Sequence, residues 1–128
     1  MPTKVFIIED DVSLVRMYSI KLKREGFIVN STLQGKNAVN LIEDFQPHII
    51  LLDIMLPDIS GIEILKELKK NPKLKKIPVI MFTVLPEIIA LKKAYELGAK
   101  GYLIKSETTP DSLTKQIKAE LKKSVEKK

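Results

Sequence analysis

Short apolar runs alternate along this chain with longer segments of helical spacing, and no other feature constrains the fold as strongly. Each run is continuous and bounded by polar residues, which is typical of strands buried on both faces of a parallel sheet. The runs predict strands at residues 5–8, 27–29, 49–52, 79–82 and 102–104, of which 27–29 is the weakest. The segments between them predict helices at residues 12–25, 36–45, 61–70, 86–97 and 110–123.

The strict alternation of these elements also predicts how they connect. Right-handed crossovers between parallel strands place helices on both faces of one sheet. The helix ends carry suitable residues, because Gly26 and Gly98 stand at C-cap positions and Thr109 precedes Pro110 at a helix start. We therefore predict the α/β class, with a doubly wound, five-stranded parallel sheet.

The length and the uniform pattern indicate one domain. A chain of 128 residues suits a single compact unit with its own core. No repeat and no linker interrupts the pattern. We expect the domain to cover residues 1–128, with the lysine-rich end frayed from about residue 124.

Missing residue types exclude several kinds of chemistry. The chain has no cysteine, which excludes thiolate catalysis, cysteine-ligated zinc and disulfides, and His48 is its one histidine. No apolar run approaches the roughly 18 residues that span a bilayer. The first apolar run ends in acidic residues, unlike a secretory signal. We expect a cytoplasmic protein without a membrane partner.

The charge balance leaves one alternative function open. The chain carries 22 basic and 16 acidic residues, a net charge of +6, and a basic α/β module can bind nucleic acid. The lysines lie in helical stretches without interleaved aromatic residues, which favours a solvated surface. We do not expect direct nucleic-acid binding, and a salt titration with random DNA separates the two interpretations.

Polar residues follow four of the predicted strands. Glu9 and Asp10 follow the first, Asp53 the third, Thr83 the fourth and Lys105 the fifth. In open α/β sheets, ligands bind at the carboxyl ends of the strands. We therefore expect these side chains to converge on one site.

The predicted site suits phosphoryl chemistry. Clustered carboxylates repel one another, and a hard divalent cation such as Mg²⁺ compensates that repulsion. Asp53 could then act as a nucleophile toward phosphorus. Lys105 would neutralise charge on the phosphoryl oxygens, and the Thr83 hydroxyl could donate a hydrogen bond to one of them.

Several motifs resemble those of response-regulator receiver domains, the CheY-like switches of two-component signalling. They are VFIIEDD, LLDIMLPDISG, VIMFT and GYLIK, in the expected order and spacing. The resemblance implies a flavodoxin-like (β/α)5 fold with strand order 2-1-3-4-5. It also implies that Asp53 is the phosphoacceptor and that the backbone carbonyl of Met55 joins Glu9, Asp10 and Asp53 around Mg²⁺ or Mn²⁺.

The same resemblance implies a signalling switch that catalyses only its own phosphoryl transfer and a slow dephosphorylation. A sensor histidine kinase or a phosphotransfer protein would donate the phosphoryl group, and Thr83 and Tyr102 would rearrange in response. A face that binds a downstream protein would then change. The protein would be a monomer or a phosphorylation-dependent dimer.

The helix predicted at residues 86–97 suggests where that face lies. Ala90, Ala94 and Leu97 fall along one side of the helix, and they suit close packing on the sheet. Ile88, Leu91 and Tyr95 fall along the other side. We expect this second stripe, with Tyr102 beside it, to be the exposed output face.

Some residues near the motifs have simpler interpretations. We expect Asp11 to cap a helix, Asp58 to serve in a turn and His48 to be exposed. Ser106 follows Lys105, where receiver domains usually have proline, so the loop there should differ.

The sequence disfavours two other functions. The acidic loop EDDVS argues against a flavin or nucleotide carrier, and Met55 stands where an aspartyl phosphatase needs an acid. A pseudo-receiver that binds partners without phosphorylation stays an alternative.

Overall fold

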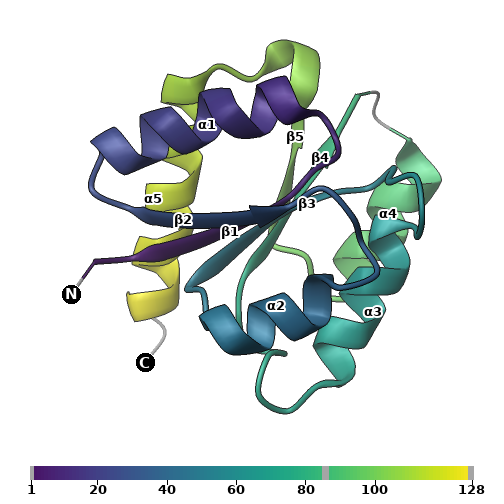
Figure 1. Ribbon diagram of the computed structural model, residues 1–128. Coiled ribbons are helices and arrows are strands. Elements are labelled where there is room, and N and C mark those ends of the chain that lie inside the picture. The colour runs from purple at the N-terminus through teal and green to yellow at the C-terminus, as the bar shows by residue number, and fades with distance from the viewer. Residues whose placement is uncertain (1, 85–86, 127–128) are drawn as a thin grey trace.

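A computed structural model describes residues 2–84 and 87–126 of the chain. Within these residues, a five-stranded parallel sheet has the order β2-β1-β3-β4-β5 (Figure 1). The strands are β1 Lys4–Ile8, β2 Ile28–Thr32, β3 Ile49–Asp53, β4 Val79–Thr83 and β5 Gly101–Ile104. The predicted fold class and strand order are confirmed.

Helices cover both faces of the sheet. α1 (Val12–Arg24) and α5 (Pro110–Glu126) lie on one face (Figure 1). The other face carries α2 (Ala38–Phe45), α3 (Gly61–Lys70) and α4 (Ile88–Glu96). A short 3₁₀ turn, η1 (Lys105–Glu107), follows β5. In the ranges that the structure describes, no helix combines the length and the apolar character needed to cross a membrane.

The central strands lie between two apolar cores. Every residue of β3 and β4 is buried. On one side, Tyr18 and Leu22 of α1 and Leu113 of α5 pack on the sheet. On the other side, side chains of α2, α3 and α4 form a second cluster. Burial on both faces explains why these strands are continuous apolar runs in the sequence.

Several element boundaries differ from the predicted ones. β2 extends to Thr32 because polar residues at the edge of the sheet, among them Asn30 and Ser31, pair with β1. α5 continues to Glu126, and fraying from about residue 124 stays a prediction. Pro86, the predicted start of the fourth helix, lies outside the described residues.

Smaller local predictions are confirmed. Gly26 and Gly98 have φ values of 94° and 103° directly after the C-caps of α1 and α4. Asp11 is the N-cap of α1, and its carboxylate accepts a hydrogen bond from the backbone N–H of Leu14 at 3.2 Å. His48 is exposed.

The predicted exposure of Leu91 is wrong. Leu91 is only 7% exposed and packs in the core, whereas Ile88, Ile89 and Tyr95 are 79%, 87% and 49% exposed. Ala94 is buried as expected. Because α4 packs on α3 as well as on the sheet, its buried stripe is wide enough to include Leu91.

We expect Leu91→Ala to lower the free energy of unfolding by about 2–5 kcal/mol, because it leaves a cavity in the core. Ile89→Ala on the same helix is the matched control, and we expect it to stay within about 0.5 kcal/mol of wild type. Urea unfolding curves measure both values. Equal effects of the two substitutions would contradict the assigned orientation of α4.

The loop between β3 and α3 is attached to the loop between β2 and α2. The Asp58 carboxylate accepts hydrogen bonds from the backbone N–H groups of Gly35 at 3.0 Å and Lys36 at 2.8 Å. The bond from Gly35 contributes most to lowering the pKa of Asp58 below its ordinary 3.8. Asp58 therefore does more than the turn role predicted for it, since it links two loops at the carboxyl edge of the sheet.

The lowered pKa of Asp58 means that its carboxylate stabilises the fold above pH 3.8, and that this contribution is lost as the pH falls through the folded-state pKa. We expect Asp58→Asn to lower the urea midpoint at pH 7, and we expect this difference to shrink as the pH falls below 3.8, because asparagine resembles the protonated acid. A midpoint difference that is independent of pH would contradict this role.

Candidate functional site

The side chains predicted from the strand ends converge at the carboxyl edge of the sheet. Asp53 and Thr83 are the last residues of β3 and β4, and Glu9 directly follows β1. These three residues are 2%, 3% and 1% exposed, respectively. Lys105 directly follows β5 and reaches back over the strand ends to Glu9 and Asp53.

Acidic side chains form a compact cluster there. One carboxylate oxygen from each of Glu9, Asp10 and Asp53 lies within 4.8 Å of the others. Glu9 and Asp53 are buried, whereas Asp10 is exposed. Oxygen atoms at this spacing, one of them open to solvent, are the kind of ligand that Mg²⁺ and Mn²⁺ prefer.

Lys105 supplies the positive charge at the buried end of this cluster. Its ammonium lies 2.5 Å from Oε1 of Glu9 and 3.0 Å from Oδ2 of Asp53. It also lies 5.5 Å from the centre of the Phe82 ring. Burial by itself would lower the pKa of Lys105, but hydrogen bonds to Glu9 and Asp53 outweigh that effect and raise it. Lys105 is therefore charged at neutral pH.

Glu9 is the carboxylate of the site whose ionised form is disfavoured by burial. Burial raises the pKa of Glu9 from 4.5 to about 7, and the hydrogen bond from Lys105 only partly offsets this effect. Oε1 of Glu9 is buried against the Lys105 ammonium, and Oε2 accepts a hydrogen bond from the backbone N–H of Asp11 at 3.0 Å, so the carboxylate still has lone pairs to offer. A buried carboxylate oxygen with unused acceptor capacity is the feature that a divalent cation would satisfy, so the residues present fit a metal.

The loop after β3 holds the Asp53 carboxylate in place. The backbone N–H of Met55 donates a hydrogen bond to Oδ1 of Asp53 at 3.1 Å. The N–H of Gly61 donates to the carbonyl of Ile54 at 2.8 Å, which closes the loop. A Cβ atom at Gly61 would collide with the backbone carbonyl of Asp53, so this close approach requires glycine. Both oxygens of Asp53 are thus hydrogen-bonded, Oδ1 to Met55 and Oδ2 to Lys105.

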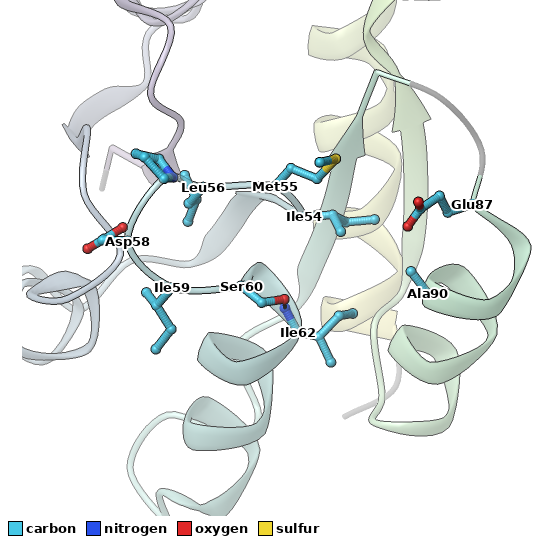
Figure 2. A pocket seen from close by; sticks show the side chains of 10 residues that line it. Ile54, Met55, Leu56, Asp58, Ile59, Ser60, Ile62, Glu87 and Ala90 are labelled. Carbon is cyan, nitrogen blue, oxygen red and sulfur yellow. Dashed lines mark hydrogen bonds between the residues drawn. The ribbon is translucent and has the colours of Figure 1, made fainter.

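A hollow lies next to this loop but does not include the carboxylate cluster. It runs between the loop and the start of α4, where Glu87 and Ala90 face Ile54 and Ile62 (Figure 2). The Met55 side chain lines it and is 67% exposed. Its lining is largely apolar, so the chemistry of the site belongs to the acidic cluster beside it.

The remaining predicted site residues lie between the cluster and α4. Thr83 is buried at the end of β4, beside the acidic cluster. Tyr102 on β5 is 40% exposed, and its ring lies edge-on to Tyr95 of α4 with 6.4 Å between the ring centres. Ile88 and Tyr95 are exposed on α4, while Leu91 does not belong to this surface because it is buried.

Sequence reasoning missed Phe82 as part of the site. Phe82 was assigned only to a buried strand, but its ring lies beneath the ammonium of Lys105. A residue next to Thr83 on a strand points to the opposite face of the sheet, which gave no reason to associate it with the site. Because Lys105 approaches from that face, the contact depends on the path of the chain after β5.

Comparisons with known proteins agree with this geometry. The sequence profile of the response regulator receiver domain matches residues 5–118. The phosphate regulon transcriptional regulatory protein PhoB of Rhizobium meliloti (strain 1021) is 32% identical over 124 residues, which make up 97% of this chain and 54% of that protein. This chain thus spans about half the length of that curated relative.

Solved structures give the same result. A CheY-like response regulator receiver domain protein from Methanospirillum hungatei JF-1 superposes with a TM-score of 0.93 at 24% identity and covers 100% of both chains. The Mn(2+)-bound form of response regulator Rcp1 superposes with a TM-score of 0.77 at 30% identity, over 88% of each chain. Because the family profile covers most of the sequence and the fold agrees with it, this chain belongs to the response regulator receiver domains, the signalling switches of two-component systems.

Proposed function

We propose that this receiver domain accepts a phosphoryl group on Asp53 from a sensor histidine kinase or a phosphotransfer protein, and that the transfer alters an exposed face that binds another protein. The observation that carries the proposal is the position of Asp53. Its buried carboxylate lies between Lys105 and the carboxylates of Glu9 and Asp10 at the carboxyl edge of the sheet.

Asp53 is the nucleophile in this proposal. Its hydrogen bonds from the Met55 N–H and from the Lys105 ammonium fix the plane of the carboxylate. A bond forms between an Asp53 oxygen and phosphorus as the bond from phosphorus to the imidazole nitrogen of the donor breaks. The imidazole leaves with that electron pair and takes up a proton. The product is an acyl phosphate.

Lys105 and Thr83 act on the transferred group. As Asp53 loses its negative charge to the new bond, the Lys105 ammonium can turn to a phosphoryl oxygen and neutralise charge there. The Thr83 hydroxyl, at the end of the neighbouring strand, donates a hydrogen bond to another phosphoryl oxygen. Thr83 is held in advance at the end of β4, and the Lys105 ammonium is held by its contacts with Glu9 and Asp53, which limits the cost of reorganisation.

Glu9, Asp10, Asp53 and the carbonyl of Met55 would hold Mg²⁺ or Mn²⁺. When bound, the cation supplies positive charge that lets an anionic phosphoryl donor approach the carboxylates. The spacing of the carboxylate oxygens and their excess of negative charge over the single Lys105 ammonium support this assignment. So does the Mn(2+)-bound form of Rcp1, at 30% identity.

The proposed output face consists of Ile88, Tyr95 and Tyr102, without the buried Leu91. These residues form an exposed apolar surface on α4 and β5. A phosphoryl group adds about −1.5 to −2 charges to the site. Movement of Thr83 toward that group would free space behind it, into which Tyr102 could turn, so the surface would change with phosphorylation.

We expect Asp53 to gain one phosphoryl group from acetyl phosphate when Mg²⁺ is present and none when a chelator removes the metal, because the carboxylates repel the donor. Intact-protein mass spectrometry measures the gain. Asp53→Asn should gain nothing, whereas Asp44→Asn, an exposed acid on α2, should behave as wild type. Phosphorylation of the Asp53→Asn variant would show that the acceptor is another residue.

We expect the pair of substitutions Ile88→Glu and Tyr95→Ser to weaken phosphorylation-dependent self-association at least about fivefold, since exposed aromatic and aliphatic anchors carry most of the affinity of such interfaces. Sedimentation velocity measures the dissociation constant. Ile28→Glu, on the opposite edge of the sheet, is the control and should have no effect. If the double variant associates as wild type does while Asp53 is still phosphorylated, the partner-binding surface lies on another face of the domain.

A further inference from the structure

The backbone of Lys105 lies outside the strand ladder, unlike that of Asp53 and Thr83 at the ends of β3 and β4. It follows β5, which in the described part of the chain pairs with β4 alone, at the edge of the sheet. Lys105 itself belongs to the 3₁₀ turn η1. Its backbone is therefore positioned by that turn rather than by a strand ladder. The residue after it is Ser106, so no proline ring fixes the backbone there either.

Thr108 closes the turn around Lys105. Its Oγ1 donates a hydrogen bond to the carbonyl of Ile104, the residue before Lys105, at 2.7 Å. Its backbone N–H donates to the carbonyl of Lys105 at 3.4 Å. The first of these bonds is short and depends on a side chain. Thr108 thus fixes the direction in which the chain leaves β5, and with it the direction of the Lys105 side chain.

Tyr18 supports Lys105 from α1 through two separate contacts. It is 1% exposed, and its hydroxyl donates a hydrogen bond to the carbonyl of Thr108 at 3.4 Å. Its ring lies edge-on to Phe82, with 5.6 Å between the ring centres. The Phe82 ring in turn lies beneath the Lys105 ammonium. Tyr18 therefore contacts both the turn that carries Lys105 and the ring that lies under its charge.

We propose that Thr108 and Tyr18 are positioning residues for phosphoryl transfer, which together hold the Lys105 ammonium between Glu9 and Asp53. This inference rests on the proposed function. Thr108 and Tyr18 contact the turn that carries Lys105, and Tyr18 also contacts Phe82, so both residues act through Lys105. Their role is to keep the ammonium where negative charge develops on the phosphoryl group, without reorganisation during the reaction.

The experiment compares the rate of Asp53 phosphorylation by acetyl phosphate in Mg²⁺ across a series of donor concentrations. Thr108→Val keeps the shape of the side chain and removes its hydrogen-bond donor. We expect the maximal rate to fall about tenfold with little change in the half-saturating donor concentration, since misplaced charge affects the transition state more than donor binding. Thr108→Ser should restore the rate, and Tyr18→Phe should lower it about threefold.

A matched control separates positioning from general stability. Thr114 makes the same kind of bond, from Oγ1 to the carbonyl of Pro110 at 2.8 Å, within α5. We expect Asp53 of the Thr114→Val variant to be phosphorylated at the wild-type rate.

The second readout is the ¹⁵N resonance of the Lys105 Nζ in NMR spectra of the unphosphorylated protein. We expect this resonance to shift in Thr108→Val and Tyr18→Phe and to stay in place in Thr114→Val.

The outcomes separate this inference from the proposed function. If wild type gains no phosphate on Asp53, the proposed function is overturned, and the Nζ resonance still tests the support of Lys105. If wild type is phosphorylated while Thr108→Val and Tyr18→Phe retain its rate and its Nζ resonance, the positioning role is overturned. An equal rate loss in Thr114→Val would overturn it as well. Tyr18→Phe keeps the buried ring and provides the test should Thr108→Val fail to fold.

Discussion

Glu9 and Asp53 are buried side by side at the carboxyl edge of the sheet, and Lys105 reaches both of them with one positive charge. Asp10 adds a further carboxylate at the solvent side of the same cluster. The cluster therefore holds more negative than positive charge. Because Glu9 is buried, its ionised form is disfavoured, and its pKa is raised. An arrangement of this kind persists only where rigid backbone holds the carboxylates together. The same imbalance makes the site receptive to a cation.

The backbone around the cluster is held in place by local features of the strand ends and of the loops beside them. Parallel strands present consecutive strand ends at one edge, so Asp53 needs no loop to bring it to the site. The absence of a side chain at Gly61 lets α3 begin against the backbone of Asp53. Asp58 attaches the same loop to the backbone of its neighbour. Lys105, at the sheet edge, relies instead on side chains from α1 and from the turn that follows it.

Much of the fold could be predicted because strand burial leaves a local pattern. The continuous apolar runs of β1, β3 and β4 arise because both of their faces are covered. β2 was predicted less well, since its outer residues Asn30, Ser31 and Thr32 are polar and belong to the strand only through pairing with β1. The site residues were predictable for a different reason. Each lies at the end of a strand or within two residues after it, and parallel topology brings these strand ends together at one edge of the sheet.

The sequence by itself determined the alternation of elements, and with it which reactive residues meet at the sheet edge, because residue type and periodicity are local properties of the chain. Tertiary structure alone decided how wide the buried stripe of α4 is, since packing against α3 is what buries Leu91. Tertiary structure also decided which side chains contact the turn that carries Lys105. Tyr18 and Thr108 are 90 residues apart in the chain, and their contact exists because α1 and the turn after β5 lie on the same face of one sheet.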